Sequence, residues 1–200
     1  MMTKIFKWRR QLMSDAHSFR IIGLCILAAF PLFGVGQALL GSEWHWLGLL
    51  MCLGNSVAVI TIGLLMRPMI ATTAPRSGGI YLSARIAEGL LLGISVMAQQ
   101  GSFIGLTTSA DTFYQLGMIA LGLGSLPMCL WLIRSKFVHT ALGALGFIGY
   151  VCLVVAMIAA ASNFETVSML LLLPGAAFEV MFGLILVLRG PGKWAQRFAL

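Results

Sequence analysis

Polar side chains capable of chemistry recur along one face of an otherwise apolar stretch, residues 81–99. They are separated by four, three, seven and four residues, and this spacing places all of them on one side of an α-helix. The stripe consists of Tyr81, Arg85, Glu88, Ser95 and Gln99. An arginine and a glutamate are costly to expose to lipid, so the stripe must point into the protein.

A second carboxylate, Glu179, lies in another apolar stretch. Gly175 and Gly183 stand four residues to either side of it, so the three share one helix face and the glycines allow a neighbouring backbone to come close. Pro174, about one turn before Glu179, predicts the broken-helix geometry that forms ion sites in transporters. Asn55, in a third stretch, is a further candidate for a polar lining, although isolated amides in membrane helices more often form inter-helix hydrogen bonds.

The two glutamates are expected at the same depth in a membrane. Glu88 is ten residues from Gly78, at the start of its helix, and Glu179 is ten residues from Arg189, at the end of its own. At 1.5 Å per residue both lie roughly 15 Å in, near the bilayer centre, with Arg85 about one turn shallower. The three form a buried charge cluster if their helices are neighbours, and Arg85 has either glutamate as its partner.

The free-energy cost of burying a charge in a membrane favours pairing among these three residues. A charge at the centre of a membrane helix costs roughly 2.5–3.5 kcal/mol on insertion scales, so three charges are not expected without partners. If Arg85 neutralises one glutamate, the other keeps an excess negative charge unless it binds a proton or a cation. The cluster is therefore either a site that handles a proton or ligand, or an ion pair that locks two helices together.

The composition of the chain is that of a membrane protein. Of its 200 residues 60% are hydrophobic and 10% are charged, whereas about a quarter are charged in soluble domains. Six apolar runs are each long enough to cross a ~30 Å hydrocarbon core. The predicted fold class is all-α, a compact bundle of six transmembrane helices forming a single domain over residues 1–200. The predicted helices cover about 20–41, 46–69, 80–104, 112–134, 137–161 and 166–189.

The basic residues predict the orientation of the chain. Twelve of the thirteen lysines and arginines precede the first helix, follow the sixth, or lie between helices two and three or four and five. The other three loops carry none, and the thirteenth basic residue is Arg85. By the positive-inside rule both termini lie in the cytoplasm. The net charge of +7 then needs no nucleic-acid partner, because basic cytoplasmic segments face anionic lipid.

The sequence also predicts the local structure of several segments. Residues 1–19 are predicted to be a solvated basic arm or, alternatively, a short interfacial helix. Residues 67–79, with a Gly-Gly turn signal, are predicted to be a flexible connection. Pro31 predicts a kink in the first helix. Small residues, among them Gly89 and Gly93, predict closely packed helices rather than a loose ring around a wide pore.

The usual signatures of catalysis are missing from the sequence. The three histidines stand at predicted helix edges, and the four cysteines fall inside predicted helices without a Cys-x-x-Cys pair. Neither a metal site nor a redox pair is therefore predicted. No nucleophile elbow and no His-Glu-x-x-His motif occurs. We expect a protein that is not an enzyme and has no cofactor, with the lipid bilayer and a small ligand or ion as its partners.

Three tracts resemble a known family. They are the Arg85-x-x-Glu88 helix, the loop Arg134-Ser-Lys-Phe ahead of a glycine-rich helix, and the run around Phe178-Glu179. Over about residues 80–190 they resemble the uncharacterised bacterial membrane family catalogued as domain of unknown function 4386. That family usually opens its fifth helix with Pro-Arg-Trp, where this chain has His139-Thr-Ala. The resemblance implies six helices in a bacterial inner membrane and no established activity.

Two functions from different classes remain open. The first is a small transporter or permeation protein, in which Glu88 and Glu179 bind a proton, cation or basic group and Arg85 sets their charge. The second is a non-transporting accessory protein, or a binder of lipid or a small apolar molecule, in which the cluster fixes helix packing. A water-filled cavity that reaches Glu179 from either side of the membrane would favour the first, and a dry, tightly packed cluster would contradict it.

Overall fold

The computed structural model of the chain describes residues 2–101 and 110–189. These residues form the helices α1 (Met2–Leu40), α2 (His45–Ala71), α3 (Pro75–Gln99), α4 (Ala110–Arg134), α5 (Thr140–Ala161) and α6 (Glu165–Arg189). Each contains a segment long and apolar enough to cross a membrane. This confirms that the chain is all-α and that it has six helices long and apolar enough to span a membrane.

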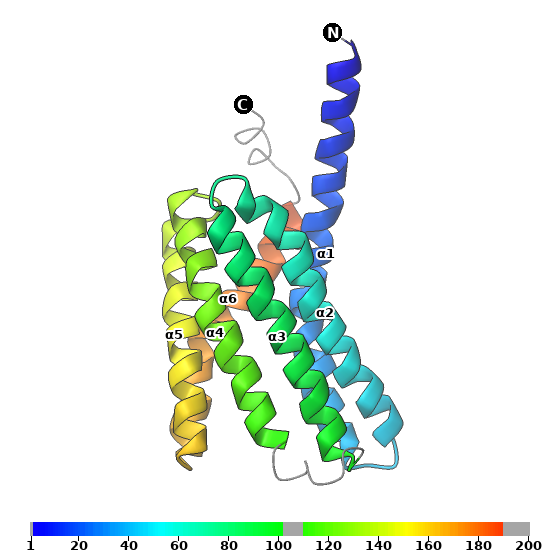
Figure 1. Ribbon diagram of the computed structural model, residues 1–200, viewed down its shortest axis with the longest axis vertical. Helices are drawn as coiled ribbons and strands as arrows, with labels where there is room; N and C mark the ends of the chain where they lie inside the picture. The colour runs from blue at the N-terminus through cyan, green and yellow to red at the C-terminus, as the bar shows by residue number, and fades with distance from the viewer. Residues whose placement is uncertain (1, 102–109, 190–200) are drawn as a thin grey trace.

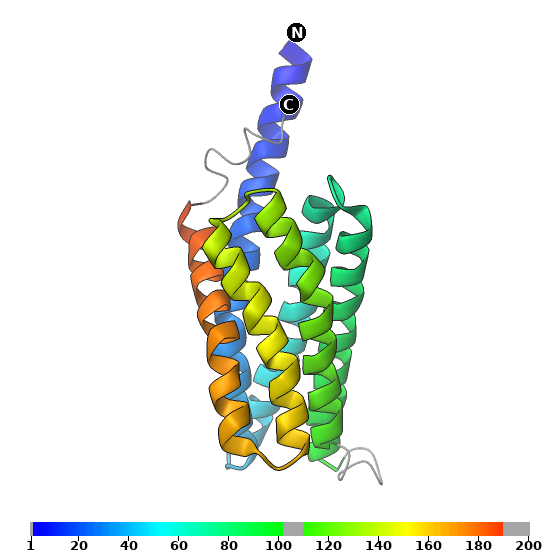
Figure 2. The ribbon, with the colours of Figure 1, turned by 90° about the vertical axis from the view of Figure 1, so that its left-hand side faces the viewer.

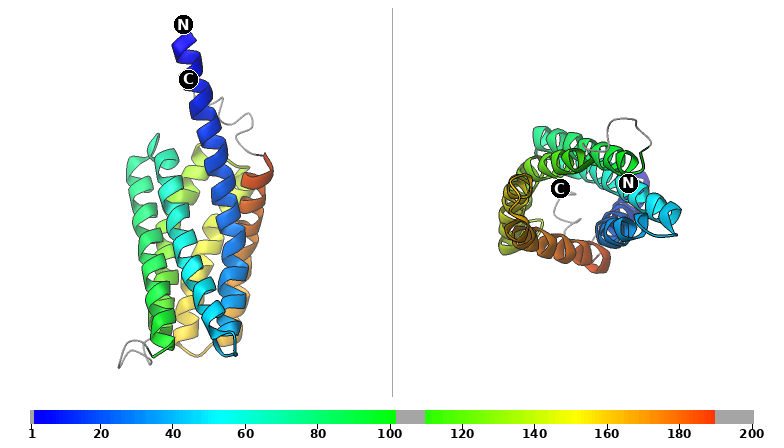
Figure 3. Two further views of the ribbon diagram at one scale, coloured as in Figure 1. Left: turned by 90° about the vertical axis from the view of Figure 1, so that its right-hand side faces the viewer. Right: turned by 90° about the horizontal axis from the view of Figure 1, so that it is seen from below.

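The helices stand side by side (Figure 1), and the view from below shows that they form a closed ring (Figure 3, right). Each helix packs against the next along the chain, and α6 packs against α1. Viewed along the helix axes, the described helices surround the middle of the ring without entering it (Figure 3, right). The sequence predicted a compact bundle of closely packed helices rather than a loose ring around a wide pore. Neighbouring helices do pack closely, but α3 and α6 lie opposite each other instead of side by side.

Glycine brings every neighbouring pair of helices together. In each of the six contacts, a Cβ atom placed on a glycine would lie less than 3.0 Å from an atom of the adjacent helix. Small residues allow such approach and are the usual basis of packing between membrane helices, where lipid is as apolar as a leucine side chain. The glycines concerned are Gly23, Gly36, Gly48, Gly63, Gly89, Gly122, Gly124, Gly143, Gly146 and Gly149.

The glycines singled out in the sequence differ in how tightly they pack. Gly89 faces α2, where an added Cβ would lie 2.6 Å from Ile60. Gly93 has room, since its nearest neighbour outside α3 would be 3.6 Å away. Gly175 lies against the backbone of Gly149 on α5, and Gly183 lies against α1.

The start of α3 differs from the prediction. The helix begins at Pro75 rather than at residue 80, because proline is favoured in the first turn, where its missing N–H would have no partner. Gly78 lies inside the helix and lets α2 approach, so that a Cβ there would be 3.1 Å from the carbonyl oxygen of Arg67. The interpretation of residues 67–79 as a long flexible connection was therefore wrong. Only residues 72–74 connect the two helices.

The end of α3 also differs from the prediction of residue 104. The helix ends at Gln99, and Gly101 adopts a φ of +67°, which terminates helices and is readily reached by glycine. The N–H of Gly101 donates to the carbonyl oxygen of Ala98 at 3.1 Å. Residues 102–104, which the prediction also placed in this helix, lie outside the described residues.

The first helix is longer than predicted. α1 is a single helix of 39 residues whose N-terminal part projects beyond the ring (Figures 1 and 2). Residues 2–19 thus continue α1 instead of forming a separate arm or a separate interfacial helix. The helix passes through Pro31 without interruption, and α6 likewise passes through Pro174. The predicted break at Pro174 is absent, because the neighbouring helix contacts hold the backbone in place around a proline.

Aromatic and aliphatic side chains fill the interior of the ring at the end where α1 projects, which we call the terminal end. The ring of Phe137 packs against Phe19 and Trp131, with centroids 5.6 and 5.3 Å apart. Other buried members of this filling, here called the terminal plug, are Ile22, Met66, Ile70, Leu132 and Leu186. The opposite, or far, end carries the connection 41–44 between α1 and α2 and the connection 162–164 between α5 and α6.

The close contact between α5 and α6 generates a stability prediction. Gly149→Ala would place a methyl group 2.6 Å from Cα of Gly175, a backbone atom that cannot rotate away. We expect the free energy of unfolding to fall by roughly 1–3 kcal/mol, the usual cost of overpacking. The midpoint of thermal unfolding in detergent micelles measures the change.

A matched control is Gly79→Ala on α3, where nothing lies within 4 Å of the added Cβ. In a helix interior this change is expected to be neutral or stabilising by up to about 1 kcal/mol. Equal midpoints for the two alanine variants would contradict the close approach of α5 and α6.

Candidate functional site

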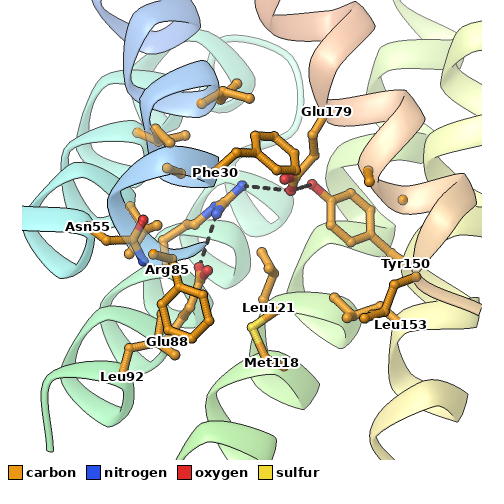
Figure 4. A pocket seen from close by; sticks show the side chains of 18 of the residues that line it. Phe30, Asn55, Arg85, Glu88, Leu92, Met118, Leu121, Tyr150, Leu153 and Glu179 are labelled. Carbon is orange, nitrogen blue, oxygen red and sulfur yellow. Dashed lines mark hydrogen bonds and ion pairs between the residues drawn. The ribbon is translucent and has the colours of Figure 1, made fainter. Parts of the chain in front are cut away.

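A cavity of about 350 Å³ lies inside the ring. Side chains from all six helices line it (Figure 4). It extends from Tyr114, four residues from the far end of α4, to Glu179, ten residues from the terminal end of α6. The terminal plug lies beyond Glu179, so the cavity occupies the far and middle parts of the ring.

The walls of the cavity are mainly apolar, and its polar groups are few. Aromatic residues such as Phe30 and Phe33 and aliphatic residues such as Leu121 and Leu153 make up most of the lining. The polar lining residues are Asn55, Arg85, Glu88, Tyr114, Tyr150 and Glu179. An apolar pocket with a few convergent polar groups is the usual form of a small-molecule site.

Arg85 is the centre of the polar cluster. Its Nη1 donates to Oε2 of Glu88 at 3.0 Å, and its Nε donates to the hydroxyl oxygen of Tyr81 at 3.0 Å. Its Nη2 points across the ring and lies 3.9 Å from Oε1 of Glu179 (Figure 4). Arg85 therefore pairs closely with Glu88 and more distantly with Glu179, which answers a question that the sequence left open.

Glu179 has a second partner, on α5. The hydroxyl of Tyr150 donates to its Oε1 at 3.0 Å (Figure 4). The glycines on either side of Glu179 face different helices, Gly175 facing α5 and Gly183 facing α1. The carboxylate between them is consequently directed into the ring. Its side chain is 22% exposed, against 4% for Glu88, so Glu179 is the acid of the cluster with the freer access to the cavity.

The stem of Arg85 fits against a glycine of α2. A Cβ on Gly63 would lie 2.6 Å from Cβ of Arg85 and 3.2 Å from its Cγ. A larger residue at this position would push the guanidinium out of reach of its partners. Gly63 is thus a positioning residue for Arg85, and the sequence alone did not identify it.

The formal charges in the cluster do not cancel. Arg85 contributes +1, and Glu88 and Glu179 contribute −1 each, so the ionised cluster carries a net charge of −1. Asn55 adds a further acceptor, because its Oδ1 is buried and has no hydrogen-bond partner among the described residues. Buried polar atoms without partners are rare, and each needs an explanation.

The remaining residues of the predicted stripe divide into two groups. Tyr81 supports Arg85, and Asn55 lines the cavity. Ser95 is buried but donates to the carbonyl oxygen of Ala110 at 2.7 Å, which links the end of α3 to the start of α4. Gln99 is exposed at the last residue of α3. The stripe is longer than the cavity, so its far end serves helix packing and solvent contact instead of the site.

Sequence reasoning did not assign Tyr150 to the site, although a signal was present. Tyr150 is ten residues from Thr140, at the terminal end of α5. Glu88 and Glu179 were placed near the bilayer centre by the same count from their helix ends. Applied to tyrosines as well as charges, this depth comparison identifies Tyr150.

Among the described residues, no group of three or more His, Cys, Asp or Glu side chains is placed to hold a metal ion. The charged side chains that line the cavity are Arg85, Glu88 and Glu179. What this arrangement can do chemically is bind one positive charge, as a proton or as part of a ligand.

The ion pairs of Arg85 generate a second stability prediction. Arg85→Ala would leave two buried carboxylates without their cation, and we expect a loss of about 3–5 kcal/mol, the usual cost of removing one partner of a buried pair. The double variant Arg85→Leu, Glu88→Leu should regain most of the loss, because a pair replaced by apolar groups of similar size is often tolerated. Thermal unfolding in detergent measures both.

Arg76→Ala is the matched control, since Arg76 is an exposed arginine on the same helix. It should change stability by no more than about 0.5 kcal/mol. If Arg85→Ala behaved like this control, the cluster would not contribute to the fold.

Comparison with known proteins gives one family. The family model described as "Domain of unknown function (DUF4386)" matches residues 37–190, a longer range than the residues 80–190 that carried the resemblance. No curated protein matches the chain, and neither does any solved structure. The matched range contains α2 to α6 and with them every charged residue of the cluster. The chain belongs to the DUF4386 family.

Proposed function

We propose that this protein is a small transporter or permeation protein in which Glu179 and Glu88 hold one exchangeable positive charge. The observation that carries the proposal is the cavity that reaches both carboxylates. A purely structural ion pair would be expected to be sealed within packed side chains. Here the more exposed acid faces an interior space large enough for a ligand, and that space ends at the terminal plug.

The charge of the cluster supports the same proposal. Arg85 neutralises Glu88 at 3.0 Å and lies 3.9 Å from Glu179, which leaves one negative charge to be compensated. Within a membrane such an excess charge is unfavourable until a cation or proton binds. Binding and release of that cation is the elementary step of a carrier, and a cavity closed at one end is what alternating access requires.

One observation favours a second candidate, a ligand-binding protein that does not transport. The terminal plug fills the ring with large side chains, several of them aromatic. A binder of a small apolar molecule needs an interior cavity but no route through the ring. Neither candidate is an enzyme, and both have the lipid bilayer and a small ligand or ion as partners.

We further propose that the protein lies in the inner membrane of a bacterium, with both termini in the cytoplasm. The basic residues of the loops at the terminal end support this orientation through the positive-inside rule. In this orientation the terminal plug lies on the cytoplasmic side, and the cavity lies toward the outside.

The orientation predicts the labelling of single cysteines. In a variant whose four native cysteines are replaced, Ser42→Cys at the far end should react with a membrane-impermeant maleimide added to intact spheroplasts. Thr72→Cys at the terminal end should react only after lysis. Both positions are exposed, so burial does not explain a difference between them. The reverse pattern would contradict the proposed orientation.

Transport predicts a proton flux that depends on Glu179. In proteoliposomes with an interior pH dye and a potassium diffusion potential, the wild-type protein should dissipate an imposed pH gradient faster than empty liposomes. Glu179→Gln should reduce this excess rate at least tenfold, because an amide of the same shape neither carries the negative charge nor exchanges a proton.

Glu165→Gln is the matched control, because Glu165 is an exposed acid at the start of the same helix. It should behave as the wild type. A wild-type rate equal to that of empty liposomes, or equal rates for wild type and Glu179→Gln, would contradict transport of protons through this site.

A further inference from the structure

We propose that the cavity binds a small apolar molecule that carries one primary ammonium group, with the ammonium held by Glu179, Glu88 and Asn55. The proposal rests on the proposed function, since it names the class of ligand that the charged site takes. It follows from which hydrogen-bonding groups the cavity offers, from the net charge of the cluster and from the nature of the walls.

The hydrogen-bond donors at the centre of the cluster point toward Tyr81 and toward the acids of the cluster itself. Arg85 uses Nε for Tyr81 and Nη1 for Glu88, and its Nη2 faces Glu179. The hydroxyl of Tyr150 donates to Glu179. An anionic ligand would meet a cluster whose net charge is −1 when both glutamates are ionised. The site therefore disfavours carboxylates and phosphates.

The acceptors, in contrast, have capacity left. Within the part of the chain that the structure describes, the hydrogen bonds of the two acids use Oε2 of Glu88 and Oε1 of Glu179, which leaves the second oxygen of each carboxylate available. A carboxylate offers about four lone-pair sites in all, so even the bonded oxygens are not saturated. These acids accept hydrogen bonds from a ligand and do not donate them when ionised.

Asn55 is the independent observation that points to a ligand. Its side chain lines the cavity, the residue is only 4% exposed, and its Oδ1 has no partner among the described residues. An unpartnered buried acceptor costs about 1–3 kcal/mol, and a ligand donor would remove that cost. A primary ammonium has three N–H donors, and the cavity presents acceptors on α2, α3 and α6, namely Asn55, Glu88 and Glu179.

The apolar walls of the cavity favour a ligand whose remaining part, beyond the ammonium group, is apolar. Phe30, Phe33 and Leu153 belong to the lining, and the rings of Phe33 and Tyr114 stack with centroids 5.4 Å apart. A cavity of about 150 Å³ holds benzene, so about 350 Å³ holds roughly a dozen non-hydrogen atoms. A hydrated metal ion would leave these apolar walls unused, whereas an arylalkylamine fills them and places its charge at the acids.

The experiment measures direct binding of tritiated 4-phenylbutylamine to the full-length protein in nanodiscs, with empty nanodiscs subtracted. We expect saturable binding that unlabelled amine displaces. The anion 4-phenylbutyrate and the neutral 4-phenylbutanol, which keep the apolar body and change the head group, should displace it at least tenfold less well. Binding that does not saturate, or that the three compounds displace equally, would overturn the proposal.

Single-residue variants test which side chains bind the ammonium group of the ligand. Glu179→Gln and Asn55→Leu should each weaken binding tenfold or more, whereas Glu165→Gln should leave it unchanged. Thermal unfolding of each variant checks the fold, and Asn55→Leu gives a second test should Glu179→Gln unfold. Wild-type affinity in both folded site variants would overturn the assignment of the site.

The same preparations separate this proposal from transport. Saturable amine binding without proton flux in proteoliposomes would contradict proton transport through this site and leave the ligand class supported. Proton flux that depends on Glu179 without amine binding would overturn the ligand class and leave transport supported.

Discussion

The structure depends on the compensation of charge in the middle of a membrane helix bundle. Arg85 lies within the apolar thickness of the ring, where an isolated cation would be strongly unfavourable. Its charge is stabilised by Glu88 one turn away, by the hydroxyl of Tyr81 and, across the ring, by Glu179. Gly63 opposite its stem keeps the guanidinium in reach of these partners. Because α3 and α6 face each other across the ring, Arg85 and Glu179 meet in its interior.

The division of the ring into a plug and a cavity has a packing cause. At the terminal end, large rings such as Phe137 and Trp131 fill the space that six helices enclose. The charged cluster lies in the middle of the ring next to this plug, and the cavity extends from it toward the far end. The cavity is the space between this cluster and the walls. Its walls are apolar, whereas Arg85, Glu88 and Glu179 place charge at the end next to the plug.

Much of the fold and of the candidate site was predictable from the sequence, and the predictions that were wrong have physical explanations. The number and type of the helices followed from apolar run length, and the common depth of Glu88 and Glu179 followed from counting residues along their helices. The arrangement of the helices in a ring did not follow from the sequence. Residue spacing shows which face of a helix is polar, but it does not show which helices are neighbours. Pro174 was expected to break α6, yet helix contacts keep the backbone regular. Gly63 and Tyr150 were missed because their roles depend on partners in other helices.

Stability alone does not account for the composition of the cluster. A buried ion pair is often no more stable than well-packed apolar residues of the same volume, so Arg85 and Glu88 are not needed to hold α3 in place. A second acid at 3.9 Å from the arginine, opposite it in the ring and reached by a cavity, adds a further desolvation cost with no neutralising cation of its own. Asn55 adds an unpartnered acceptor in the same space. Each of these features costs free energy on burial, and one positively charged donor would offset the cost of both. This is why we propose that the cluster holds a cation in addition to any role in helix packing.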